Sequence, residues 1–324
     1  MTPDLSIVVT PRERLSGLQK CLRSLKAAAD CDTEFIVINQ GYTRADLARA
    51  ARVVAPAELR VIGDGSFLSE GAARNLGLEA ARAPTWVLLV DGEVTVAADV
   101  IEKLRRGADQ SGAAVVVPLI LERPGVIHSS GGELVIPDSP SGEITYRGDY
   151  MDQDCSRAFA LDRTELGMVE THIMLIDKSL LGTAPFAQDH IHLFHFDFSL
   201  TCQKNGWLMV REPSALALFN QPPPLSWRDY EFYSQRWNKT RFEEDSARFV
   251  EKWGYTCRGR ELEAFEQFAL RMSIFPGRLR NRLTQPLSNA VVAGRKGAGG
   301  LLRARRLRHE GGRLTLTPSG GSAR

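Results

Sequence analysis

The chain has 324 residues, of which 43% are hydrophobic and 25% charged, and it contains 28 Gly and 16 Pro. This ordinary composition excludes fibrous, mostly disordered and disulfide-scaffold classes, and the length suits one large or two smaller compact units. The formal net charge of +2 conceals an uneven distribution. From Leu270 onward there are twelve basic side chains and one acidic side chain, so this tail carries +11; the body before it, with 29 basic and 38 acidic residues, carries −9.

Cysteine spacing and hydropathy bear on the cellular compartment. The five cysteines are scattered and include no Cys-x-x-Cys pair, so neither a disulfide framework nor a zinc knuckle is expected. The N-terminus lacks a basic segment followed by an apolar run, and no stretch reaches the roughly 18 apolar residues of a spanning helix. We therefore expect a cytoplasmic protein that is soluble or peripherally associated with the cytoplasmic face of a membrane.

In the first 120 residues, short apolar runs alternate with amphipathic segments. Strands are predicted over residues 5–10, 34–39, 59–63, 86–90 and 114–120, and helices over 14–28, 44–54, 70–81 and 97–108. This alternation is typical of βαβ units and of a largely parallel sheet.

The pattern changes after residue 120. Residues 122–157 are rich in Gly, Ser, Pro and Asp, and so long an irregular stretch in a compact protein is more often functional than idle. A strand is predicted over 169–177, a helix over 196–205 and extended segments over 207–212 and 215–219. Residues 227–253, rich in aromatic and charged side chains, predict one or two amphipathic helices.

Two carboxylates, Asp91 and Glu93, follow the predicted strand 86–90 and flank Gly92. Open α/β sheets bind ligands beyond the carboxyl ends of their strands. Carboxylates at such a place suit Mg²⁺ or Mn²⁺ held together with a diphosphate. The alternative is an ordinary acidic turn, because Asp-Gly is common after any strand.

Several segments occur in an order that resembles a known family. Residues 6–11 (SIVVTP), 35–41 (FIVINQG), 71–78 (GAARNLGL) and 88–94 (LLVDGEV) resemble the nucleotide-sugar half of family 2 glycosyltransferases with the GT-A fold. The resemblance continues through residues 171–181, 197–206 and 211–220, and it covers roughly residues 5–255. Any one segment is a weak signal, whereas the ordered series is a strong one.

The resemblance implies an α/β fold with a GT-A-like, Rossmann-type mixed sheet flanked by helices and a C-terminal helical extension. Residues 1–120 would form the nucleotide-sugar-binding half of the domain, and residues 121–222 the acceptor-binding and catalytic half. Residues 223–275 would be the helical extension, and residues 276–324 a basic, flexible tail.

The donor site implied by the resemblance consists of Thr10, Pro11, Asn39, Arg74, Asn75 and Asp91. Thr10 and Pro11 would line the nucleobase pocket, and Arg74 suits phosphate or ribose recognition through its planar fork of donors. Asn39 stands where the family usually has an Asp that accepts a hydrogen bond from the base. Its amide can still accept through the carbonyl oxygen, but Asn39 is equally explained as a turn residue.

The metal site implied by the resemblance consists of Asp91 and Glu93 with Mg²⁺ or Mn²⁺. Asp91 would meet the ribose or a metal-bound water, and Glu93 would be the ligand, one methylene longer than the family's usual Asp. Asn220 stands where some relatives have a His as a further ligand.

The catalytic base implied by the resemblance is His195, which stands where the family usually has an Asp. Histidine suits general-base work, because its ordinary pKa is about 6.5. Asp197 would orient His195 or cap the helix. Asp189 and Glu170 are further candidates for acceptor contacts or for the base.

Histidines cluster around this position, with His190 and His192 preceding His195. A catalytic or acceptor-site role is favoured, while a zinc site and packed core histidines remain alternatives. His128 is expected to be a surface-loop residue. The aromatic residues Trp227, Tyr230, Tyr233 and Trp237 are spaced as a helix-packing core, the alternative being a sugar-stacking face.

The implied function is transfer of a sugar from a nucleotide-diphosphate donor to a hydroxyl group of a glycan, a lipid-linked molecule or a protein. The mechanism would be inverting and metal-assisted, and the setting would be polysaccharide or glycoconjugate synthesis. The basic tail suits a membrane surface carrying anionic lipids, and no nucleic acid partner is expected.

Two other functions remain open at this point. A non-catalytic descendant that binds a nucleotide or a glycan would explain why Asn39, Glu93, His195 and Asn220 all depart from the family pattern. A nucleotidyltransferase on a related sheet is the second alternative, and the absence of a Gly-rich, Arg-containing loop after the first strand weighs against it.

Overall fold

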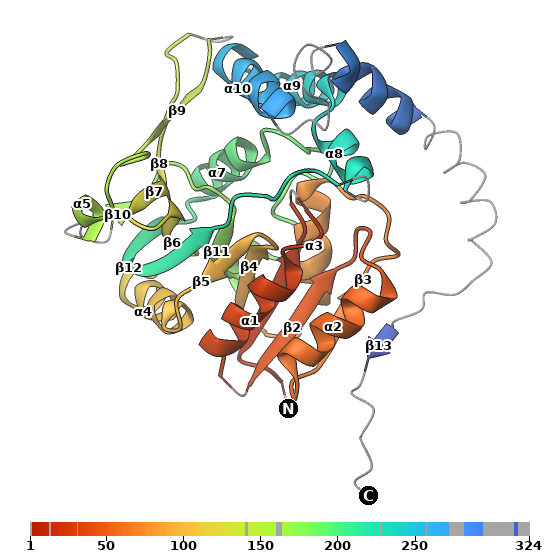
Figure 1. The fold of residues 1–324 in the computed structure, drawn as a ribbon. Helices are drawn as coiled ribbons and strands as arrows, with labels where there is room; N and C mark the ends of the chain where they lie inside the picture. The colour runs from red at the N-terminus through yellow and green to blue at the C-terminus, as the bar shows by residue number, and fades with distance from the viewer. Residues whose placement is uncertain are drawn as a thin grey trace, which may run out of the picture.

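The structure is a computed structural model, and it describes residues 2–12, 14–30, 32–139, 142–159, 164–226, 229–256, 258–271, 282–293 and 314–316. Its centre is an 11-stranded mixed sheet in the order β10-β12-β6-β11-β4-β1-β2-β3-β13, with β5 and β7 paired at its side. Helices cover both faces of the sheet (Figure 1). The predicted mixed sheet flanked by helices is therefore confirmed.

The N-terminal part of the sheet is parallel. It contains β1 (Leu5–Thr10), β2 (Thr33–Ile38), β3 (Leu59–Ile62) and β4 (Trp86–Asp91), with β1 between β2 and β4. The crossover helices are α1 (Leu18–Ala28), α2 (Arg44–Val54) and α3 (Glu70–Ala80). The first helix begins four residues later than predicted, because Arg14 belongs to a loop whose backbone N–H is held by Glu93 at 2.5 Å.

Successive residues of these strands enter different cores because side chains alternate across a pleated strand. Ile7 and Val9 pack with α1, α2 and α4 (Val100–Ser111) on one face. Val8 packs with α3 and with α7 (Phe194–Asn205) on the other. The sheet is thus buried on both sides, as its uninterrupted apolar strands predict.

The second half of the sheet is mixed. β6 (Val115–Arg123) and β4 are both antiparallel to β11 (Ile173–Asp177), and β12 (Met209–Phe219) runs parallel to β6. β12 is one strand with an irregularity between Glu212 and Leu216, where two extended segments were predicted. Shorter elements complete this half: β5 (Val94–Val96), β7 (Val126–Ser129), β10 (Thr164–Glu165), α5 (Ser156–Phe159) and α6 (Lys178–Leu181).

The stretch over residues 122–157 is more ordered than predicted. It contains β7 and a separate two-stranded sheet of β8 (Gly132–Val135) and β9 (Thr145–Gly148). Its turn-forming residues connect these short strands, which is why the composition resembles a continuous loop.

A third core joins the second half of the sheet domain to the helices that follow it. Those helices are α8 (Tyr230–Arg236), α9 (Lys239–Trp253) and α10 (Arg258–Arg271). Phe196 and Leu200 of α7 pack in one cluster with Tyr233 of α8 and Phe249 of α9. Tyr230, Tyr233 and Trp237 are buried there, as the core interpretation of their spacing predicts, whereas Trp227 lies outside the described residues.

The region predicted as a flexible tail is partly ordered. Residues 282–293 form a further helix whose Leu287 and Val291 pack against the third core. β13 (Leu314–Leu316) pairs antiparallel with β3 at the sheet edge. The remaining residues of the predicted tail lie outside the described part of the chain. No helix within the described part is long and apolar enough to cross a membrane.

Candidate functional site

The predicted site lies where β1 and β4 end side by side. Thr10 and Asp91 are register partners, and the backbone N–H of Gly92 donates to the carbonyl oxygen of Thr10 at 2.8 Å. Thr10 and Pro11 are buried at this edge. The structure therefore brings Thr10, Pro11 and Asp91 of the predicted donor site together at this edge.

Asp91 is wholly buried, and both of its carboxylate oxygens accept hydrogen bonds. Oδ1 accepts from Nη2 of Arg74 at 2.7 Å, and Oδ2 lies 3.1 Å from Nη1 of Arg12 and 3.0 Å from Nδ1 of His172. Two guanidinium groups and a ring nitrogen thus surround this carboxylate. In this arrangement the Asp91 carboxylate fixes the positions of Arg12, Arg74 and His172.

Arg74 and Glu70 extend this network across α3. Arg74 donates to the Glu70 carboxylate at 2.5 Å and to the carbonyl oxygen of Thr171 at 2.9 Å. The other oxygen of Glu70 pairs with Arg236 of α8. A continuous buried ionic chain therefore connects β4 with the helical extension, and its charges alternate in sign, as buried charges require.

Asn75 was predicted to bind the donor, but its side chain forms hydrogen bonds with the backbone of Phe186. Its amide nitrogen donates to the carbonyl oxygen of Phe186 at 2.8 Å, and its amide oxygen accepts the Phe186 N–H at 3.2 Å. Asn75 thus fixes the segment before residue 190 against α3. Its contribution to the site is the position of that segment.

His172 and His128 form a pair behind Asp91. Their Nε2 atoms lie 3.2 Å apart, and the ring of Phe219 lies within 5 Å of both imidazoles, with centroid distances of 4.6 Å and 4.9 Å. Burial lowers the pKa of both histidines, that of His172 strongly. His128 was predicted in a surface loop; it instead lies on β7, because that segment pairs with β6.

Glu170 and His195 line a cavity of about 180 Å³ together with Arg12 and Arg236. Burial alone would raise the pKa of Glu170, but His195, His172 and Arg12 together hold it below its ordinary value. Burial lowers the pKa of His195, which keeps its imidazole neutral at neutral pH. Its Nδ1 has no hydrogen-bond partner among the described residues. The cavity therefore presents a neutral imidazole next to a carboxylate and two arginines.

Glu93, the second predicted metal ligand, is only 3% exposed, and one of its oxygens accepts the backbone N–H of Arg14. Asn220 lies next to it and donates to the Glu93 carbonyl oxygen at 2.7 Å. Asp91 does not fit a metal ligand as its oxygens lie, since each already accepts from a cationic or ring group. Glu93 fits the single carboxylate that suffices for Mg²⁺ when a substrate diphosphate supplies the other oxygens.

No group of three or more His, Cys, Asp or Glu side chains in the described part of the chain could hold a metal ion. This finding disfavours the zinc alternative for the histidine cluster. His192 is packed against the rings of Phe242 and Phe265, with centroids 5.4 Å and 5.0 Å away. Burial lowers its pKa to about 3, so His192 matches the packed-core alternative.

Asn39 forms a turn at the end of β2. Its Oδ1 accepts the backbone N–H groups of Gly41 and Tyr42 at 3.2 Å and 2.9 Å. This is the local bonding expected of the turn alternative. The side chain is half-buried beside the glycines that follow β3.

Asp197 and Asp189, the other predicted catalytic carboxylates, lie apart from the cavity that His195 lines. Asp197 is wholly buried, and its Oδ1 accepts from Nζ of Lys252 and Nε1 of Trp253, both at 2.7 Å. Asp189 is exposed and lines another cavity, of about 470 Å³. Of the three predicted catalytic residues, the structure brings only His195 to Arg12 and Glu170.

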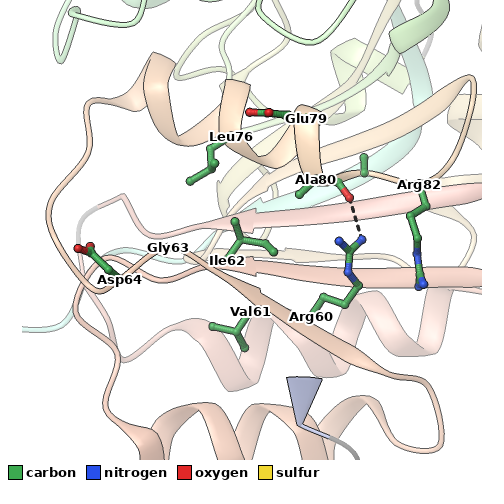
Figure 2. Close-up of a pocket in the computed structure, with 10 residues that line it drawn as sticks. Arg60, Val61, Ile62, Gly63, Asp64, Leu76, Glu79, Ala80 and Arg82 are labelled. Carbon is green, nitrogen blue, oxygen red and sulfur yellow. Dashed lines mark hydrogen bonds between the residues drawn. The ribbon is translucent and has the colours of Figure 1, made fainter. Parts of the chain in front are cut away.

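A hollow of about 720 Å³ lies along β3 and the second half of α3. Figure 2 shows Arg60 among the residues that line it, and Arg60 donates to the carbonyl oxygen of Ala80 at 2.7 Å. Arg60 and Arg82 both pair with the buried Glu34. Because none of the predicted site residues lines this hollow, we assign no part of the reaction to it.

Sequence reasoning did not identify four residues of the buried network: Arg12, Glu70, His172 and Arg236. Glu70 could have been found from its i, i+4 spacing to Arg74 on one helix. Arg12 follows Thr10 and Pro11 in the first loop, a position at which a cation can reach the sheet edge. Arg236 carries no sequence signal, because only the packing of α8 brings it to Glu70.

Comparisons with known proteins place this geometry in context. Residues 6–165, close to half of the chain, match the glycosyl transferase family 2. The succinoglycan biosynthesis protein ExoO of Rhizobium meliloti (strain 1021) is 28% identical over 115 residues, which are 36% of this chain and 32% of that protein. The chain thus spans about a third of the length of this curated relative.

Two solved structures resemble this chain at low sequence identity. GalNAc-T7 with UDP, GalNAc and Mn²⁺ superposes with a TM-score of 0.52 at 15% identity, over 82% of this chain and 54% of that chain. Residues 1–349 of S. aureus TarS in complex with UDP-GlcNAc give a TM-score of 0.47 at 15% identity, over 72% and 65%. The likeness to GalNAc-T7 confirms the GT-A-like arrangement of the sheet and its helices.

Proposed function

Since residues 6–165 of this chain belong to glycosyl transferase family 2, we propose that the protein transfers a sugar from a nucleotide-diphosphate donor to a hydroxyl group of an acceptor. One observation carries this proposal. A cavity beside the ends of β1 and β4 holds Glu170 and His195 next to Arg12. A proton acceptor and a cation for a leaving diphosphate thus lie at the edge of the sheet where α/β folds bind nucleotides.

His195 is the base in this proposal. Its neutral imidazole would take the proton of the acceptor hydroxyl as the oxygen attacks the anomeric carbon, and the bond from that carbon to the donor diphosphate breaks. Attack from the face opposite the leaving group inverts the configuration. The Glu170 carboxylate would stabilise the imidazolium that forms, because opposite charges at close range favour the charged form.

Arg12 is the cation that we assign to the leaving diphosphate. Its side chain is 12% exposed and lines the cavity, whereas Arg74 is buried between Asp91 and Glu70. A guanidinium group that Asp91 orients would meet charge developing on the diphosphate without reorganising. Arg74 and Asp91 therefore position Arg12 and His172 in this scheme.

We propose that a divalent ion, Mg²⁺ or Mn²⁺, arrives with the donor diphosphate and that Glu93 is the carboxylate on the protein side. When bound, such an ion neutralises charge on the phosphate oxygens. The proposal is supported by the place of Glu93 two residues after Asp91, at the end of β4, and by Mn²⁺ in the GalNAc-T7 structure. Asp91 keeps its arginine partners in this arrangement.

Polysaccharide synthesis is the setting that we propose, supported by the likeness to ExoO. The acceptor is then a glycan, free or lipid-linked. The excess of basic residues after Leu270 supports a position at an anionic membrane surface on the cytoplasmic side.

The decisive experiment incubates the full chain with UDP-, GDP- and dTDP-sugars plus Mn²⁺ and oligosaccharide acceptors. Release of the nucleoside diphosphate and calorimetric binding of UDP, GDP and dTDP are measured in parallel. We expect acceptor-dependent release with at least one donor. Binding without release under every acceptor would favour the non-catalytic nucleotide-binding alternative, and the absence of any nucleotide binding would refute the transferase.

A further inference from the structure

A second cavity is lined by α8, next to the cavity that holds His195. It has a volume of about 470 Å³, within the range of small-molecule sites. Its walls come from the segment before α3, the segment before α7 and the helical extension, and they include Phe67, Asp189, Gln235 and Arg241. Ile191 lines both this cavity and the one that holds His195.

Gln235 points to a ligand in this cavity. Its side chain is 4% exposed, and its Oε1 has no hydrogen-bond partner among the described residues. A buried amide oxygen without a donor is costly, since desolvation is not repaid by a hydrogen bond. A ligand that donates a hydrogen bond to this oxygen would remove the cost.

Arg241, in contrast, requires a hydrogen-bond acceptor from the same ligand. Its Nε is buried without a hydrogen-bond partner among the described residues, and burial lowers the pKa of its guanidinium. This group therefore needs an acceptor. A fully deprotonated anion such as sulfate offers acceptors only, so it cannot satisfy Gln235, and the exposed Asp189 carboxylate at the same cavity would repel any anion.

Hydroxyl groups donate and accept at once, and a pyranose carries several of them around a ring whose C–H faces pack on aromatic side chains. Phe67 offers such a ring, fixed edge-on against Phe232 with centroids 5.1 Å apart. We infer that this cavity binds a saccharide unit through hydrogen bonds to Gln235, Arg241 and Asp189.

The place of the cavity assigns that saccharide to the acceptor. Gln235 and Arg236 are consecutive on α8, and the first lines the saccharide cavity while the second lines the cavity with His195. A glycan whose terminal hydroxyl lies at His195 can therefore extend past Ile191 to Gln235. This assignment rests on the proposed transferase function and makes Gln235 and Arg241 determinants of acceptor length.

The test compares saccharide binding and nucleotide binding in the same full-length preparations. Mono- to tetrasaccharides of glucose and galactose are titrated by saturation-transfer NMR, and UDP, GDP and dTDP by calorimetry. The variants are Gln235→Leu and Arg241→Gln, with Ala72→Leu as a third that narrows the cavity from α3 without removing a polar group. Arg52→Gln, an exposed change on α2, is the matched control.

We expect wild type and Arg52→Gln to bind a tri- or tetrasaccharide, and the three cavity variants to bind it at least tenfold more weakly with unchanged nucleotide affinity. Their KM for that acceptor rises while their kcat stays within about threefold. Two results would refute the saccharide site without affecting the transferase proposal. One is unchanged saccharide affinity in Ala72→Leu and Arg241→Gln. The other is a wild-type protein that transfers sugar but binds no saccharide. A different result is also informative: the wild type could bind the saccharide but no nucleotide, and the variants could lose the saccharide. That result would support the saccharide site and refute the transferase function. The saccharide could then no longer be assigned as the acceptor.

Discussion

Asp91 and Arg74 form an ion pair of 2.7 Å between side chains that are 0% and 1% exposed. Breaking a buried pair from one side leaves an uncompensated charge, which typically costs about 3–5 kcal/mol. We therefore expect Arg74→Met to lower the free energy of unfolding by about 3 kcal/mol or more in urea titrations. Asp91→Asn combined with Arg74→Met should cost less than the sum of the two single changes.

The control for this prediction is the pair of Arg49 and Asp46 on α2, which is 2.6 Å apart and in which the Arg49 side chain is 52% exposed. Arg49→Met should cost less than about 1 kcal/mol, because solvent screens such pairs. Equal losses at Arg74 and Arg49 would show that the buried network does not stabilise the fold.

Substitution of His195 should affect catalysis, whereas substitution of Asp197 should affect stability. We expect His195→Gln to lower kcat by about 10²–10⁴, the usual contribution of a general base, with donor affinity nearly unchanged. Asp197→Asn should instead lower the free energy of unfolding by about 1.5–3 kcal/mol, because its charged oxygen accepts from Lys252 and Trp253. Its kcat should stay within about threefold.

Steady-state kinetics and urea titrations on both variants check this division. Lys252→Met, which removes one partner of Asp197, is the matched control and should behave like Asp197→Asn. If His195→Gln keeps its kcat while Asp197→Asn or Asp189→Asn loses it, the base is one of those carboxylates.

Binding of Mn²⁺ should depend on nucleotide. Because Glu93 is the one carboxylate that we assign to the ion, the protein alone should bind Mn²⁺ too weakly to detect at micromolar concentration by electron paramagnetic resonance. Addition of the nucleoside diphosphate that the enzyme binds should produce a bound Mn²⁺ signal. Glu93→Gln should weaken that ternary binding about tenfold or more.

Two results would contradict the metal proposal. One is tight Mn²⁺ binding in the absence of nucleotide, which would require a protein-only ligand set. The other is sugar transfer that continues at an undiminished rate in excess EDTA.

Stability should fall as the pH drops below neutrality. The pKa of His192 is about 3 in the folded protein, against an ordinary value of 6.5, because burial penalises its charged form. Between pH 7.5 and pH 5.5 the unfolded chain therefore binds a proton at His192 that the folded chain does not. This difference removes about 1.4 kcal/mol from the free energy of unfolding.

The variant His192→Gln does not titrate, so its loss between these two pH values should be smaller by about 1.4 kcal/mol. Urea titrations of both proteins at pH 7.5 and pH 5.5 measure the difference. Parallel losses in the two proteins would show that His192 is accessible to protons in the folded state.

The sheet was predictable where apolar periodicity decides structure. Strands β1, β2 and β4 are buried on both faces, so their sequences are nearly continuous apolar runs whose limits agree with the structure to within about a residue. The ordering in residues 122–157 was missed, because β8 and β9 form a small separate sheet and turn residues dominate the composition of this stretch. The helix over 282–293 was missed because its Leu287 and Val291 stabilise it through a partner distant in sequence.

The site was predictable as a location and less so as a set of contacts. Asp91 was found because a strand's end fixes where its last side chain lies. That its carboxylate accepts from Arg12, Arg74 and His172 could not be predicted, since these residues come from three separate segments. The resemblance implied that Asp197 orients His195 or caps the helix, and only the packing of α9 shows its link to Lys252.

The third core has a consequence for where the chain could be cut. Residues 223–275 follow the sheet domain in sequence, yet Phe196 and Leu200 of α7 are buried by rings that those helices supply. A protein ending at residue 222 would leave this apolar surface bare to water and Asp197 without Lys252 and Trp253. The helical extension therefore belongs to one cooperative unit with the second half of the sheet domain, and a shortened protein should aggregate.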